Sequence, residues 1–162
     1  MCKRICTAML LLAVLHTGCE TRKNMQSTAE NRRTIIRNDT LFEFYTLPAD
    51  HKIKVERHKF YYWFQTDTIL VSQSGYSPRL LHGRYRSFYP NRNLMEEGVF
   101  RNGLKHGEWR SWQPTGHLRS VINWRNGSRE GYSTEYAQDT VSSRTFYRNN
   151  QAVTDSLPAK TK

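Results

Sequence analysis

Cysteine and long apolar runs are both scarce in this 162-residue chain. Its 3 cysteines all lie within residues 1–19, so the rest of the chain cannot form an internal disulfide. The apolar run at residues 7–15 is too short for a membrane-spanning helix. The hydrophobic fraction of 37% and the mean hydropathy of −0.78 are low for a compact globule with a deep core. These shortages exclude a disulfide-stabilised fold and disfavour a large globular core.

Recognisable catalytic patterns are also missing from the sequence. No glycine-rich phosphate loop and no nucleophile elbow occurs. Glu96 and Glu97 are adjacent, so on a strand they point to opposite sides and cannot work as a paired acid and base. We therefore predict a protein that is not an enzyme and needs no cofactor. An envelope enzyme with a dispersed site is the less favoured alternative.

Residues 1–18 are typical of a secretory signal helix, with a basic start, an apolar run and small residues before Cys19. The ending resembles a bacterial lipobox, in which the cysteine is lipidated and becomes the new N-terminus. His16 stands where that pattern prefers leucine, so ordinary secretory cleavage or an uncleaved anchor remains an alternative. We expect a lipoprotein of the bacterial cell envelope, at the outer membrane or periplasmic face, with a lipidated tether at residues 19–33.

Acidic residues are few relative to basic ones. The net charge is +11, and without the two basic residues of the signal 23 basic residues face 14 acidic ones, a net charge of +9. Such a surplus suits anionic lipid headgroups or acidic polymers. Nucleic acid would also suit it, but an exported chain would not meet nucleic acid, so we predict none. A merely solvated basic surface is an equally weighted alternative.

Aromatic residues are the most abundant unusual feature. The chain has 7 Phe, 9 Tyr and 4 Trp, and 17 of these 20 lie between Phe60 and Tyr147. Large rings bury much area while their polar tips stay wet, which suits a thin sheet covered by rings. A helical bundle would want more leucine and alanine and fewer β-formers. The composition thus predicts an all-β protein.

A period of 24 residues runs through the aromatic region. It divides the chain into four units, at residues 58–81, 82–105, 106–129 and 130–153. The first position of the units is occupied by His58, His82, His106 and Glu130, and the seventh by Phe64, Phe88, Trp112 and Tyr136. We predict a domain of four hairpin repeats, preceded by capping strands within residues 34–57 and followed by a disordered tail at residues 154–162.

Each unit reads as a hairpin. The Asn-Gly pairs at 102–103 and 126–127 predict tight turns with positive φ at both positions. The first strand of a unit is less regular, because rings such as Tyr85 and Phe88 are three residues apart and would face opposite sides of a regular strand. Either a bulge intervenes or both faces of the sheet carry rings.

A recurring motif resembles the membrane occupation and recognition nexus (MORN) repeat. It reads His-Gly-x-aromatic-Arg-Ser-aromatic, then Leu, then aromatic-Arg-Asn-Gly. It is closer still to the bacterial variant in YwqK-type antitoxin proteins. The resemblance is strongest over residues 82–129 and weakest over 58–81. It implies an elongated antiparallel sheet of stacked β-hairpins that serves in binding or scaffolding. The same resemblance supplies an alternative function, an antitoxin or immunity protein that neutralises a toxin by direct binding.

The recurring histidines are the obvious candidates for metal ligands. His58, His82 and His106 would lie in equivalent places on the sheet, about 9 to 10 Å apart because two strand spacings separate them. Zinc ligands bond at about 2 Å from a shared ion. We therefore predict no metal site and assign the His-Gly pair to the turns.

The arginines are the better candidates for a binding surface. Arg86 and Arg110 share one repeat position and form a first ladder, and Arg101, Arg125 and Arg148 share the position just before the turn and form a second. Beside the rings they would make a basic stripe for headgroup phosphates or an acidic partner. The alternative is that they stack on rings and pair with nearby glutamates. The sequence thus predicts a non-catalytic envelope lipoprotein whose repeat sheet binds a protein or an anionic envelope component.

Overall fold

The computed structural model describes residues 31–77 and 79–153, and every regular element within them is a β-strand. The expected signal helix, the lipidation site Cys19 and the tail at 154–162 lie outside the described residues. The strands are β1 (Arg32–Arg37), β2 (Thr40–Thr46), β3 (Phe60–Gln65), β4 (Thr68–Gln73), β5 (Leu81–Phe88), β6 (Leu94–Arg101), β7 (Leu104–Trp112), β8 (Leu118–Arg125), β9 (Ser128–Ala137), β10 (Thr140–Arg148) and β11 (Gln151–Val153). The described part of the chain contains no helix able to span a membrane. The prediction of an all-β, antiparallel fold is confirmed.

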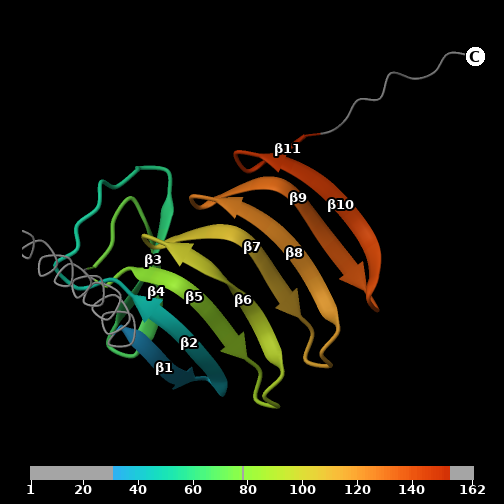
Figure 1. The fold of residues 1–162 in the computed structure, drawn as a ribbon, viewed down its shortest axis with the longest axis horizontal. Coiled ribbons are helices and arrows are strands. Elements are labelled where there is room, and N and C mark those ends of the chain that lie inside the picture. Colours follow the sequence, from blue (N-terminus) through green and yellow to red (C-terminus); the bar gives the residue numbers. More distant parts are fainter. Residues whose placement is uncertain (1–30, 78, 154–162) are drawn as a thin grey trace, which may run out of the picture. The chain divides into compact units, whose positions relative to one another are not determined.

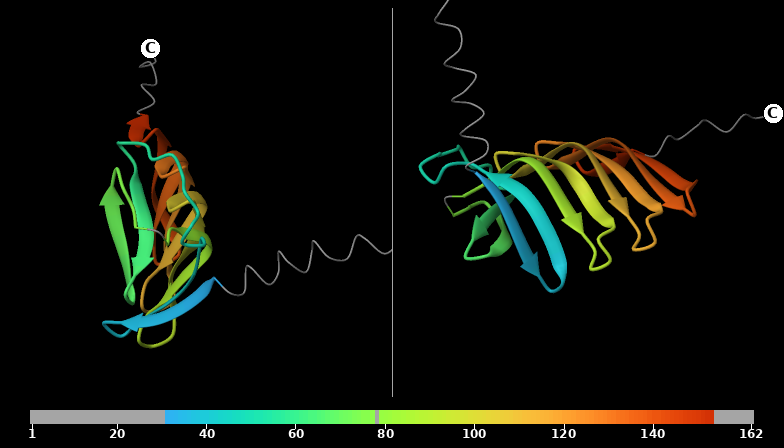
Figure 2. Two further views of the ribbon diagram at one scale, coloured as in Figure 1. Left: turned by 90° about the vertical axis from the view of Figure 1, so that its left-hand side faces the viewer. Right: turned by 60° about the horizontal axis from the view of Figure 1, so that its bottom comes forward.

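Nine of the strands form one antiparallel sheet in the order β1-β2-β5-β6-β7-β8-β9-β10-β11 (Figure 1). Strands β3 and β4 form a separate two-stranded sheet. This β3–β4 hairpin lies as a second layer against one face of the large sheet (Figure 2, left). We call the face toward the hairpin the inner face and the opposite one the outer face.

The prediction of four equivalent hairpin repeats in one sheet needs correction at the first unit. Residues 82–153 do form consecutive strands of the large sheet, but residues 58–81 leave it, and β2 pairs directly with β5. In the other units the second position is a glycine with a positive φ of 71° to 95°. Here it is Lys59, a buried residue whose Nζ donates a hydrogen bond to Ser128 Oγ at 2.7 Å. The expected capping strands are β1 and β2, and β1 begins at Arg32, inside the expected tether.

The tight turns form as predicted, and one of them has a second role. In the pairs at 102–103 and 126–127 both residues have positive φ. The Gly103 N–H donates to Leu81 O at 2.7 Å and the Gly103 carbonyl accepts from Tyr62 N at 2.8 Å. A Cβ at residue 103 would collide with the side chain of Leu80. The turn between β6 and β7 therefore holds the β3–β4 hairpin as well as joining two strands.

The first strand of a unit carries rings on both faces of the sheet. The register shifts between Ser87 and Phe88 where β5 pairs β6, and between Ser111 and Trp112 where β7 pairs β8. Tyr85 stays buried on the inner face, and the Arg86 guanidinium lies 5.8 Å from the Phe88 ring. Strand β5 pairs with β2 without a shift from Tyr85 to Phe88, so these two rings lie on opposite faces. The bulge falls in the partner strand β6, where Met95 is the extra residue.

The apolar core lies between the β3–β4 hairpin and one half of the large sheet. One cluster consists of Phe44, Phe64, Leu81, Tyr85, Phe100 and Trp109, and the other of Tyr61, Leu80 and Leu104. All of these residues come from β2 to β7 or from the segment that joins β4 to β5. Within residues 31–77 and 79–153 no second sheet lies over the inner face of β8 to β11, so we call β2 and β5 to β7 the covered half of the sheet and β8 to β11 the open half.

Candidate binding pocket and inner groove

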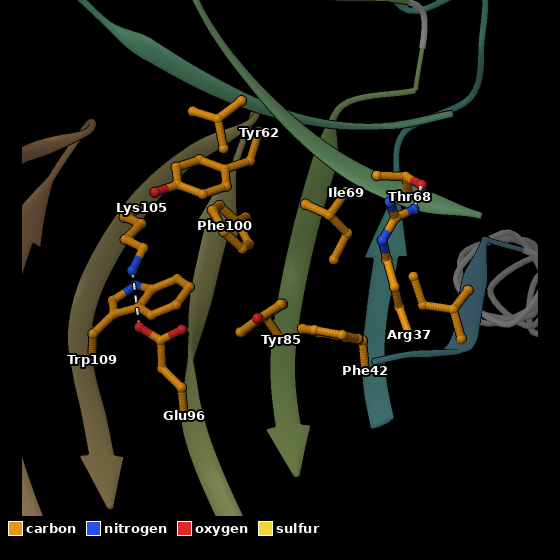
Figure 3. A pocket seen from close by; sticks show the side chains of 12 residues that line it. Arg37, Phe42, Tyr62, Thr68, Ile69, Tyr85, Glu96, Phe100, Lys105 and Trp109 are labelled. Atoms are coloured by element: carbon orange, nitrogen blue, oxygen red, sulfur yellow. Dashed lines mark hydrogen bonds and ion pairs between the residues drawn. The ribbon is translucent and has the colours of Figure 1, made fainter. Parts of the chain in front are cut away.

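An apolar pocket of about 310 Å³ lies between the β3–β4 hairpin and the covered half of the sheet (Figure 3). Its walls are formed by residues of strands β1 to β7. Ile35 and Phe42, which are register partners on β1 and β2, form one side. The full lining is Ile35, Arg37, Phe42, Tyr62, Thr68, Ile69, Val71, Tyr85, Glu96, Phe100, Lys105 and Trp109. Most of the surface is therefore carbon, and charged groups occur only near the ends.

Packed rings make the floor of the pocket. The Phe100 ring centroid lies 4.9 Å from that of Tyr62 on the hairpin and 5.4 Å from that of Tyr85 on the sheet. Burial, with a smaller contribution from the Glu96 carboxylate, raises the pKa of both the Tyr62 and the Tyr85 hydroxyl. Both hydroxyls are therefore neutral at physiological pH.

One end of the pocket is closed by a lysine held over a ring. Lys105 Nζ lies 2.9 Å from Glu96 Oε1 and 3.9 Å from the centroid of the Trp109 ring, as the close-up shows (Figure 3). The Trp109 indole N–H donates to Val99 O at 3.2 Å. A Cβ at Gly98 would collide with the Trp109 ring, so that ring lies directly on the backbone of β6. One face of the indole is thus occupied by Gly98 and the ammonium group sits over the ring.

Arg37 stands at the other end of the pocket. Its guanidinium donates a hydrogen bond from Nη1 to Thr68 Oγ1, which connects β1 to the start of β4. The residue is exposed, and it forms no ion pair with any residue in the described ranges. Arg37 is therefore a cation at the mouth of an apolar pocket whose charge is not neutralised by an ion pair within the described fold.

A second hollow, the inner groove, continues from the closed end over β7 and β8 and reaches β9 at Glu135. Its volume is about 390 Å³, and it shares Glu96, Lys105 and Trp109 with the pocket. Further along it is lined by Ser111, Ser120, Ile122, Trp124 and Glu135. The Lys105–Glu96 ion pair therefore separates a covered pocket from an open groove.

Basic groups alternate with rings along this inner face. Lys105 Nζ lies 5.5 Å from the Trp124 ring centroid, and the Arg129 guanidinium lies 5.9 Å from Trp124 and 5.1 Å from Tyr147. We call Lys105, Trp124, Arg129 and Tyr147 the cation–aromatic row. Lys105 and Arg129 both occupy the last position of their 24-residue units, so the period alone shows that they are equivalent. Their role in a binding surface was not predicted from the sequence, because the strand register decides that each of them lies beside rings.

The first predicted arginine ladder is neutralised on the outer face. Arg86 Nη2 lies 2.9 Å from Glu43 Oε2. Arg110 pairs with Glu108 at 2.6 Å and with Glu97 at 3.8 Å. The register places Glu43, Arg86, Glu97 and Arg110 in one row across β2, β5, β6 and β7. The structure therefore agrees with the alternative expectation, that Arg86 and Arg110 pair with nearby glutamates.

The second predicted ladder remains exposed. Arg101, Arg125 and Arg148 end β6, β8 and β10, so they lie at the same edge of the sheet. All three are exposed, and none forms an ion pair with another residue that the structure describes. Adjacent members are two strands apart, about 9 to 10 Å, and screening at physiological ionic strength weakens their mutual repulsion.

Two of the four first-position residues bond to the backbone of a neighbouring turn, whereas His106 Nδ1 is buried with no hydrogen-bond partner among the described residues. His82 Nδ1 accepts a hydrogen bond from the Asn102 N–H at 3.2 Å, and Glu130 Oε2 accepts one from the Asn149 N–H at 3.0 Å. Burial is the main cause that lowers the pKa of His82, which favours the neutral ring that this acceptor role needs. Among the described residues there is no cluster of three or more histidine, cysteine or acidic side chains placed to hold a metal ion.

Comparison with protein-family models, with curated proteins and with solved structures finds no match to this chain. The resemblance to MORN and YwqK-type repeats therefore remains an interpretation of the sequence pattern.

Proposed function

We propose that this protein is a non-catalytic binding module of the bacterial envelope, anchored through lipid on Cys19, whose MORN-like repeat sheet takes up a partner on its inner face. The partner is a protein or an anionic envelope component. The observation that carries the proposal is the inner groove, because a sheet with no further role would not leave its ring-bearing face uncovered over β8 to β11.

The cation–aromatic row has the chemistry of an interface centre. Tryptophan, tyrosine and arginine dominate the binding energy of protein interfaces. Here the basic groups are already held against rings, so little side-chain freedom is lost when a partner docks. Glu135 supplies one exposed acid beside them. The inner face therefore offers the groove and, beside it, the positive charge of Arg129 held between two rings.

The test is affinity capture of the tagged full chain from its own cells, comparing two charge reversals. Arg129→Glu places an acid in the cation–aromatic row and is expected to lose the captured partner. Arg144→Glu is the matched control, because Arg144 also lies over a ring, 3.9 Å from Tyr132, but on the outer face. Equal loss with both variants, or no loss with either, would contradict the inner face as the binding surface.

The anchoring part of the proposal has its own test. Cys19→Ala is expected to move the protein from the membrane fraction to the soluble fraction, because the proposed lipid is attached only at Cys19. Unchanged membrane association would contradict anchoring while leaving the inner-groove proposal intact.

A further inference from the structure

We propose that the apolar pocket under the β3–β4 hairpin binds one alkyl chain of a single-chain anionic amphiphile, with the anionic head held by Arg37. This is a separate site from the inner groove and does not depend on the partner proposed above. The shared chemistry of the ligand is a carboxylate or a phosphate at the end of an alkyl chain.

The lining of the pocket selects for an alkyl chain. Between its two ends the walls are formed by the side chains of Phe42, Ile69 and Val71 and by the rings of Tyr85 and Phe100. A sugar or a nucleobase would bring several hydrogen-bonding groups into this apolar stretch and leave them unpaired, which costs free energy for each group. A volume of about 310 Å³ lies at the small end of the range for small-molecule sites. One chain fits these limits better than a bulky polar ligand.

The closed end of the pocket disfavours a flat aromatic ligand. The most prominent ring there is Trp109, which has Gly98 against one face and Lys105 Nζ 3.9 Å from its centroid. A stacked ligand would have to displace an ammonium group that is also ion-paired with Glu96 at 2.9 Å. A methyl terminus makes no such demand, because it needs only apolar contact.

The mouth of the pocket supplies the charge that fixes the orientation. The Arg37 guanidinium carries five N–H donors, and its one hydrogen bond in the described fold goes to Thr68 Oγ1. The remaining donors match the geometry of a carboxylate or phosphate, which arginine binds in a bidentate manner. Lys105 at the far end is already neutralised by Glu96. The head is therefore expected at Arg37 and the chain terminus near Lys105, the two ends of the pocket in Figure 3.

The experiment uses the full chain carrying Cys19→Ala, titrated calorimetrically with dodecanoate, dodecyl phosphate and dodecanol below their micelle-forming concentrations. We expect saturable binding of one dodecanoate or dodecyl phosphate per chain, and the tighter of the two identifies the head group. Arg37→Gln should weaken the anionic probes about tenfold or more, as the loss of a charge-assisted hydrogen bond implies, and should leave dodecanol unchanged. Arg84→Gln, which removes an exposed arginine of β5 that does not line the pocket, should change none of the three.

A second variant tests the pocket rather than the charge. Ile69→Trp fills the space between β4 and the sheet and should abolish binding of all three probes, whereas Val141→Trp on the exposed part of β10 should not. The proposal is overturned if the parent chain shows no saturable binding or if Arg37→Gln behaves like Arg84→Gln. It is also overturned if a folded Ile69→Trp variant still binds. Capture of the inner-groove partner should persist in Arg37→Gln, so failure of either proposal is distinguishable from failure of the other.

Discussion

The covered and open halves of the sheet are built from the same repeat but are stabilised differently. In the covered half the inner-face ring of Trp109 is 2% exposed, whereas in the open half the inner-face ring of Tyr147 is only partly buried. The fourth position of successive units is Tyr85, Trp109 and then Ser133, so the large ring is lost where the hairpin no longer covers the sheet. The repeat therefore sets the backbone, and the inserted hairpin decides which half acquires a core.

The largest expected difference between the halves comes from removing a ring. Trp109→Ala should lower the free energy of unfolding by about 3 to 5 kcal/mol, because it leaves a cavity in the core. Tyr147→Ala removes a partly buried inner-face ring of the open half, whose centroid lies 5.1 Å from the Arg129 guanidinium, and it should cost about 1 kcal/mol or less. Urea denaturation of both variants is the measurement. Similar losses would show that the two halves are equally packed.

A smaller effect is expected from adding a methyl group under the same ring. Gly98→Ala should destabilise the protein by about 1 to 3 kcal/mol, because the new Cβ overlaps the Trp109 ring. Gly75→Ala is the matched control, since a Cβ at that position meets nothing within 4 Å. Thermal denaturation of the two variants decides the point, and a Gly98→Ala protein as stable as the control would refute the close packing of Trp109 on β6.

The turn of the covered half should also respond to pH. Burial lowers the pKa of His82, so between this lowered pKa and the ordinary value near 6.5 the unfolded chain binds more protons than the folded one. Stability should therefore fall as the pH falls through that window. His82→Gln should flatten the dependence of the melting temperature on pH, whereas the exposed His58, changed to Gln, should leave it as it is. An unchanged slope in His82→Gln would contradict the role of the neutral ring.

The smallest effect is expected at the exposed edge that spans both halves. Replacing Arg101, Arg125 and Arg148 together by Gln should leave stability within about 0.5 kcal/mol of the parent for each substitution. If these arginines bind anionic surfaces, the triple variant should lose salt-dependent association with anionic liposomes, measured by co-sedimentation. No change in association would contradict a binding role for these three arginines and identify them as ordinary solvated surface residues.

The sequence was sufficient for the features that depend on local chemistry. The Asn-Gly pairs predicted both tight turns, and the 24-residue period predicted the consecutive hairpins of residues 82–153. The departure of residues 58–81 from the sheet was not predicted, although Lys59 in place of a glycine marks that unit as different. The period made this unit look equivalent, and the decision between stacking and folding over the face depends on contacts distant in sequence, such as Lys59 with Ser128.

The candidate sites were less predictable than the fold. The pocket is lined by residues of the seven strands β1 to β7, which the chain brings together only in three dimensions, so Arg37 had no distinguishing context in the sequence. Arg86 and Arg110 were predicted as a basic ladder, but the register places Glu43 and Glu97 beside them. The sequence contained each of these residues, whereas their pairing depends on which strands are neighbours.

Hydrogen exchange of the backbone amides tests most directly whether the hairpin divides the sheet into a covered and an open half. The account predicts that peptides from β5 to β7 exchange only through global unfolding, and that peptides from β10 and β11 exchange far faster through local opening. Uniform protection from β5 to β11 would contradict it.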